Sequence, residues 1–141
     1  MIDLGIVLAL QDSGIGTYGT DLWVNQSPVL NNGAVGSKRG IFVNSNGASS
    51  SGDSYSDMIT ISVREEDILA QSIVLARLNE WARSLSEDCC SLPLRPLVEF
   101  DPIQVVSISD RSAATTAAID DEGRFVKEIT FMITYKLPAL S

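Results

Sequence analysis

The sequence predicts a single α+β domain, in which a mostly antiparallel sheet of four to five strands carries two main helices. The 141 residues suffice for one domain with a modest core, and no boundary divides residues 1–141. Several segments alternate apolar and polar residues, as strands do, and long hairpin-like connections separate them. Residues 65–86 instead repeat apolar residues at steps of three and four, as helices do. Successive strands with helices packed on them are typical of α+β folds.

The first predicted elements are a helix and two strands. Residues 2–11 are apolar nearly all round, which suits a buried helix or a strand. Asp3 as a cap and Gly14 as a stop favour the helix. Residues 20–25 alternate and contain β-favouring side chains, and so do residues 39–44. Each of these two segments therefore predicts a strand.

A loop and a third strand are expected next. Residues 45–56 are rich in Gly and Ser and nearly free of apolar side chains, so we expect a mobile loop. Residues 57–64 alternate cleanly, which predicts a strand. Its apolar face carries Ile59, Ile61 and Val63.

Residues 65–86 predict the clearest helix. Glu65, Glu66 and Asp67 suit its first turn, because the helix dipole attracts negative charge there. The larger apolar stripe consists of Ala70, Val74, Leu78, Trp81, Ala82 and Leu85. A smaller stripe on the far side consists of Leu69, Ile73 and Ala76. This smaller stripe suits either burial between two layers of one subunit or contact with another subunit.

Two further strands complete the expected sheet. Residues 102–110 predict one strand, and residues 124–137 predict the longest strand of the chain. One face of the long strand consists of Phe125, Ile129, Phe131, Ile133 and Tyr135. Small and polar side chains fill residues 111–122, so we expect a second mobile loop there.

The composition argues against most chemistry. Histidine is absent, which removes the usual general base, the common zinc ligand and the histidine-activated nucleophiles. Cys89 and Cys90 are adjacent, which suits two reduced thiols better than a strained disulfide. The acidic trio Asp120, Asp121 and Glu122 matches no EF-hand loop, so we expect a solvated turn. We therefore expect no catalytic residue, no metal and no cofactor.

Charge and hydropathy limit the partners. The net charge is −8, which argues against tight binding of duplex DNA, because phosphate binding requires clustered Lys and Arg. The apolar runs are too short to span a bilayer, and no basic leader precedes them, so we expect neither a membrane segment nor a signal peptide. We expect a protein that is made in the cytoplasm.

One glycine motif raises a second possibility. GIGTYG places Gly14, Gly16 and Gly19 in the G-x-G-x-x-G spacing of dinucleotide-binding loops. The residues that follow start a helix poorly, and no acid follows between Leu22 and Gly52 to hold a ribose. A helix stop followed by a turn into a strand explains the motif better.

Three stretches together resemble the tail terminator or minor capsid (head–tail joining) proteins of long-tailed bacteriophages. They are GIGTYGTDLWVNQSPV, ITISVREEDILAQSIVLARLNEWARSL and DDEGRFVKEITFMITYK. The resemblance rests on the order and spacing of elements over residues 5–136. It implies a structural virion protein of the tail or neck, whose ring, most often of six copies, caps the head-proximal end of the tail tube. Such a ring ends tube polymerisation and joins the tail to the head connector.

The residues suggest where such a ring makes contact. The stripe Leu69, Ile73 and Ala76 offers one face, and the exposed edge or end of strand 124–137 offers the other. Arg64 and Arg124, each at a strand end, suit either surface ion pairs within the subunit, which is the default, or bridges to another subunit. Ser49 and Asp53 in the first loop, and Thr115 and Asp120 in the second, are expected to dock on the tube protein or the connector. The resemblance also implies that DNA passes through the bore without specific binding, and a surplus of carboxylates suits a repulsive lining.

Three alternatives stay open. The chain can be another neck protein, such as a stopper or a tail completion protein. It can be a nucleotide-binding enzyme that uses Gly14, Gly16 and Gly19. It can also be a cytoplasmic adaptor domain, which forms no ordered ring.

Overall fold

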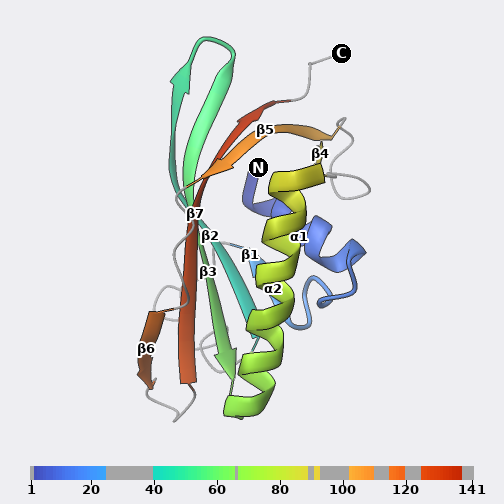
Figure 1. Cartoon of the computed structure of the whole chain (residues 1–141), viewed down its shortest axis with the longest axis vertical. Coiled ribbons are helices and arrows are strands. Elements are labelled where there is room, and N and C mark those ends of the chain that lie inside the picture. Colours follow the sequence, from blue (N-terminus) through green and yellow to red (C-terminus); the bar gives the residue numbers. More distant parts are fainter. Residues whose placement is uncertain are drawn as a thin grey trace.

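The computed structural model describes residues 2–24, 40–65, 67–88, 91–92, 102–109, 115–119 and 125–137. Two helices and seven strands occur in these residues (Figure 1). In chain order they are α1 (Ile2–Asp12), β1 (Leu22–Val24), β2 (Gly40–Ser51), β3 (Ser54–Glu65), α2 (Ile68–Asp88), β4 (Ser91–Leu92), β5 (Ile103–Ser109), β6 (Thr115–Ile119) and β7 (Phe125–Lys136). The α+β class with two helices is confirmed, whereas the sheet has more strands than the four to five expected.

One mixed sheet contains all seven strands. Its order is β1-β2-β3-β7-β5-β4, and β6 also pairs with β7. The β1–β2 pair is parallel and every other pair is antiparallel. Figure 1 shows α1 and α2 on the same side of the sheet, where α2 packs against β3 and α1 packs against β1 and β2. The sheet is therefore covered by helices on one face.

The core lies between this covered face and the helices. The predicted inward face of β3, with Ile59, Ile61 and Val63, is buried. On β7 the buried side chains are Ile129, Phe131, Ile133 and Tyr135, as predicted. The helices contribute Ile2, Ile6, Val7, Leu10, Leu75, Leu78, Trp81 and Ala82. The alternation of apolar residues along each strand directs one side chain in two to this interior.

The helix α2 differs in detail from the prediction. It begins at Ile68, so Glu65 belongs to β3 and Asp67 directly precedes the helix, while Glu66 lies outside the described residues. Its buried face also includes Leu75 and the polar Gln71. The side-chain amide of Gln71 donates a 3.1 Å hydrogen bond to the backbone carbonyl of Val63. This bond ties the first turns of α2 to β3 and gives a fully buried polar side chain a partner.

Residues 45–56 form strands rather than the expected loop. They make up the outer half of the β2–β3 hairpin, in which Ser51 pairs with Ser54 across a two-residue turn at Gly52 and Asp53. Gly52 has a φ of 65°, which glycine adopts without strain. Backbone hydrogen bonds hold this ladder, and β7 pairs with the same part of β3 on its other side. The polar composition therefore did not prevent strand formation.

The expected loop at 111–122 is also wrong in part. Residues 115–119 form β6, which pairs with the first residues of β7. The strand β7 is consequently internal, with β3 along one edge and β5 and β6 along the other. The expectation of an exposed edge on the C-terminal strand is wrong, because β3, β5 and β6 pair with it within the subunit, whereas the use of its end stays a prediction. The short strand β4 was not predicted from the sequence.

Candidate functional site

The outer face of α2 carries an exposed apolar patch. Leu69 is 71% exposed, Ile73 56% and Ile68 50%, and Ala76 is exposed as well. We refer to these four residues as the α2 patch. Leu69, Ile73 and Ala76 are neighbours at steps of four and three, so these three form a contiguous stripe, and Ile68 lies in the same first turn as Leu69 but about 100° away around the helix. The alternative that this stripe is buried between two layers of one subunit is wrong. Contiguous exposed apolar surface is typical of protein–protein contacts, and that role stays a prediction.

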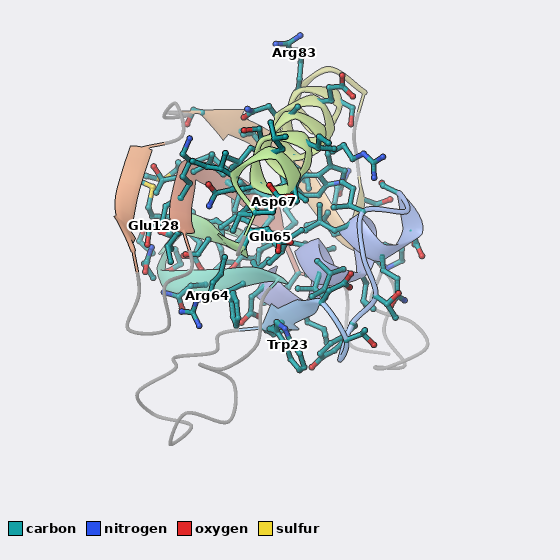
Figure 2. The ribbon with its side chains drawn as sticks, turned by 90° about the horizontal axis from the view of Figure 1, so that it is seen from below. Trp23, Arg64, Glu65, Asp67, Arg83 and Glu128 are labelled. Carbon is teal, nitrogen blue, oxygen red and sulfur yellow. The ribbon has the colours of Figure 1, made fainter. Side chains whose placement is uncertain are left out.

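Acidic side chains surround the start of α2. One carboxylate oxygen of Asp67 accepts a 2.8 Å hydrogen bond from the backbone N–H of Leu69, which is an N-cap. A depression of about 450 Å³ lies beside it, lined by Thr20, Asp21, Gly40, Glu65, Asp67 and Ala70. Figure 2 shows Glu65 and Asp67 at this end of the helix. Across the described ranges, no cluster of metal-ligating side chains is placed to hold an ion. The α2 patch thus begins beside negative charge.

A groove lies between α2 and the residues that follow α1. It has a volume of about 550 Å³ and is lined by Ser13, Gly14, Ile15, Arg77, Glu80, Trp81 and Ser84. We refer to it as the α1–α2 groove. Trp81 is buried and Ile15 is half-buried against the core, so both supply apolar lining. Arg77 and Glu80 are exposed and supply charge. Sequence reasoning missed this groove because its two walls are more than sixty residues apart along the chain.

Arg64 lies away from the α2 patch. Its guanidinium stacks over the ring of Phe42, 4.8 Å from the ring centroid, in a cation–π contact. Figure 2 shows Arg64 on the side of the sheet opposite α2. The structure therefore does not bring Arg64 together with Leu69 and Ile73 in one surface. The fifth predicted interface residue, Arg124, lies outside the described residues.

The predicted docking residues fall on two strand pairs. Ser49 lies on β2 and Asp53 in the turn that joins β2 to β3, at one end of the molecule (Figure 1). The Asp53 carboxylate lies 3.6 Å from the ammonium of Lys136 on β7, and both side chains are exposed. Thr115 begins β6, and Asp120 lies outside the described residues. Their role in docking stays a prediction.

The GIGTYG segment closes a helix and turns into a strand, as the alternative interpretation predicted. Gly14 has a φ of 77°, and the N–H of Ile15 donates to the carbonyl of Leu10, which is a Schellman cap of α1. The strand β1 follows, so the segment meets the C-terminal end of α1 and does not lead into the N-terminus of a helix, which a phosphate site requires. The carboxylate of Asp21 accepts a 2.6 Å hydrogen bond from the N–H of Thr17. A phosphate would meet this negative charge.

A buried carboxyl group lies in the hairpin and went unnoticed in the sequence. Asp57 on β3 is 2% exposed and accepts a hydrogen bond from the hydroxyl of Ser45. Within the described parts of the chain, its Oδ1 finds no hydrogen-bond partner. Burial raises the pKa of the Tyr135 phenol above 10.0, and the nearby Asp57 charge raises it further. The alternation of β3 places Asp57 on the covered face, which was the available signal.

Comparison with known proteins gives no family assignment. No protein-family model matches the chain, and no curated protein matches it. In the part of the chain that the structure describes, neither helix combines the length and hydropathy that a membrane span requires.

Proposed function

We propose that this protein is a structural, non-enzymatic subunit of a bacteriophage virion. Copies of it form a ring of about six subunits that caps the head-proximal end of the tail tube. The ring ends tube polymerisation and joins the tail to the head connector. The observation that carries this proposal is the α2 patch, in which Leu69 and Ile73 are more than half exposed on an otherwise well-packed helix. Contact with a protein partner would remove this apolar patch from water, which is favourable.

The distribution of surfaces supports ring formation. A ring requires a heterologous contact, in which two different faces of one subunit meet. The α2 patch lies on the helical side of the sheet, and Arg64 lies on the other side. A subunit with distinct features on its two sides can contact two neighbours at once.

The charge supports passage of DNA through the ring. The chain has a net charge of −8. A negatively charged bore repels the phosphate backbone, and it offers few cations whose binding would release counterions. Specific or tight DNA binding is therefore no part of the proposed role.

The assembly state of the purified protein tests the proposal. Light scattering coupled to size exclusion is expected to show a ring of about six copies, alone or with the tail tube protein. Electron micrographs are expected to show a central hole. Tails produced without the protein are expected to exceed normal length. A chain that stays monomeric even with tube protein present, together with tails of normal length in its absence, would overturn the proposal.

A further inference from the structure

We propose that Asn46 and Gly47 form a self-modification site, at which the side-chain amide of Asn46 converts to an acid without an enzyme. The pair lies on β2, where the outer half of the β2–β3 hairpin begins. The reaction requires only water as a co-reactant. It is independent of the ring-forming role proposed above.

Asn46 is followed by the residue that least hinders attack by its own backbone nitrogen. Among the described residues the asparagines are Asn44, Asn46 and Asn79, and only Asn46 precedes a glycine. Because glycine has no Cβ, the nitrogen of Gly47 can approach the Asn46 side chain more closely than the nitrogen of a bulkier residue. Within the described part of the chain, Asn46 is therefore the asparagine most open to this attack.

The pair also lies in a β-bulge. The register between β2 and β3 shifts between Ser45 and Ala48. The two residues in between, Asn46 and Gly47, consequently have no Cα partner on β3. A bulge interrupts the ladder locally, so these two residues are held less tightly by pairing than the rest of the strand.

The surroundings of Gly47 leave room for the reaction. Gly47 has a φ of 105°, and an added Cβ would meet no atom within 4 Å. Both residues are exposed, so water reaches the pair. The Gly47 nitrogen bonds to Cγ of Asn46, and Nδ2 leaves with the proton of that nitrogen as ammonia. Water then adds to either carbonyl carbon of the succinimide and breaks its bond to nitrogen, which gives aspartate or isoaspartate.

The modification removes a cross-strand link of the hairpin. Nδ2 of Asn46 donates hydrogen bonds of 3.1 Å to the carbonyl of Met58 and of 3.1 Å to the hydroxyl of Thr60. Its Oδ1 accepts a 3.1 Å hydrogen bond from Nδ2 of Asn44. A carboxylate has no donor, so an anionic oxygen would face the Met58 carbonyl in place of an N–H group. The product therefore has a more negative and less firmly held outer hairpin.

Peptide mapping by mass spectrometry tests the site in native protein that is aged in neutral and in mildly alkaline buffer. Residue 46 is expected to convert to the acid at a rate within about tenfold of that in the same chain unfolded in urea. The rate is expected to rise with pH, because the attack requires loss of the Gly47 amide proton. Asn44 and Asn79 are internal controls, and they are expected to convert at least about tenfold more slowly. The mapping separates Asn46 from the Asn–Gly pair outside the described residues.

Two variants test the chemistry separately. Asn46→Gln keeps an amide on a longer side chain that closes the ring less readily, and Gly47→Ala adds a methyl group beside the attacking nitrogen. Each variant is expected to slow conversion at residue 46 by at least about tenfold. Gly47 has a positive φ, so alanine can strain the bulge, and Asn46→Gln is free of that strain. Circular dichroism verifies that each variant is folded.

The structural consequence has its own test. Asn46→Asp imitates one product and is expected to lower the melting temperature by roughly 3 °C, because the Met58 carbonyl loses its donor. Asn79→Asp makes the same change at an exposed position of α2 and is the matched control, with a shift below about 1 °C. Equal melting temperatures of Asn46→Asp and the native protein would contradict the loss of this link.

Three results would overturn the self-modification site. The first is conversion of residue 46 in the folded protein more than about tenfold slower than in urea, which would show that the fold protects it. The second is conversion in both Asn46→Gln and Gly47→Ala at the native rate. The third is conversion of Asn44 or Asn79 as fast as that of Asn46.

Discussion

The carboxylate of Asp67 accepts a 2.8 Å hydrogen bond from the backbone N–H of Leu69. The residue directly before α2 therefore caps the backbone at Leu69, whose side chain is the most exposed apolar one among the described residues of the helix. The carbonyl of Asp67 completes this start by accepting from the N–H of Gln71 at 3.0 Å. Both hydrogen bonds stabilise the first turn of α2, which carries Ile68 and Leu69.

Asp67→Ala is expected to lower the free energy of unfolding by about 1 kcal/mol, because an N-cap acceptor is lost. Urea denaturation followed by circular dichroism measures the change. Asp67→Asn keeps an oxygen acceptor and serves as the control, with a loss of at most a few tenths of a kcal/mol. Equal losses in the two variants would show that the side chain does not cap α2.

Ile73→Asp is expected to abolish rings and leave the monomer folded. The side chain is 56% exposed, so a carboxylate there costs the monomer less than about 1 kcal/mol, whereas it is poorly tolerated in an apolar contact. Light scattering measures the assembly state, and thermal melting verifies the fold. Asn79→Asp adds a carboxylate on the same helix outside the patch and is the matched control. Unchanged rings in Ile73→Asp would exclude this part of α2 from the interface.

Gly40→Ala is expected to destabilise the fold by at least about 2 kcal/mol. Gly40 has a φ of 137°, and a Cβ there would collide with the backbone carbonyl of Asp21. That carbonyl also accepts from the N–H of Ile41 at 2.8 Å, so it cannot move away freely. Gly52 also has a positive φ, but a Cβ there would meet no atom within 4 Å. Gly52→Ala is therefore expected to lower the free energy of unfolding by only about 1 kcal/mol. Chemical denaturation of both variants compares the two costs.

NAD, NADP and ATP are expected to leave the melting temperature of the native protein unchanged. A ligand that binds the folded state must raise it, and here Asp21 occupies an N–H group of the glycine segment. Differential scanning fluorimetry with each nucleotide at millimolar concentration provides the measurement. A saturable rise in melting temperature that is absent in Gly16→Ala would instead support nucleotide binding at this segment.

Alkaline pH is expected to reveal the burial of Tyr135. Its pKa in the folded state is raised above 10.0, chiefly by burial and further by the Asp57 charge. Below pH 10.0 both states keep the proton, so the stabilisation is fully present. As the pH rises past that value, the unfolded state ionises first and stability falls. Denaturant titrations from pH 9 to 11 are expected to show a steeper loss for the native protein than for Tyr135→Phe; parallel curves would contradict the shift.

Much of the fold follows from local pattern in the sequence. The alternation at Ile59, Ile61 and Val63 predicted the buried face of β3, and the spacing of three and four predicted α2. The stripe of Leu69, Ile73 and Ala76 was predicted to lie away from the sheet, and it is exposed. These predictions succeed because side-chain direction in a helix or strand depends on local geometry alone.

Other features depend on contacts between distant residues. The Ser-rich residues 45–56 form strands because this part of β2 pairs with β3, and β3 pairs with β7 on its other side. Amino-acid composition does not reveal such pairing. In the same way, β6 forms against β7, and that pairing removes the free edge that the long strand was expected to offer.

The sequence by itself determined the α+β class, the two helices, the inward faces of the long strands and the residues of the smaller apolar stripe of α2, whose exposure the structure decided. Only the tertiary structure decided that Arg64 lies across the sheet from Leu69, and that Ile15 and Trp81 line one groove. The physical reason is how far apart along the chain the interacting residues lie. Periodicity orients side chains about one element, whereas a surface built from several elements depends on which strands pair and which helices pack together.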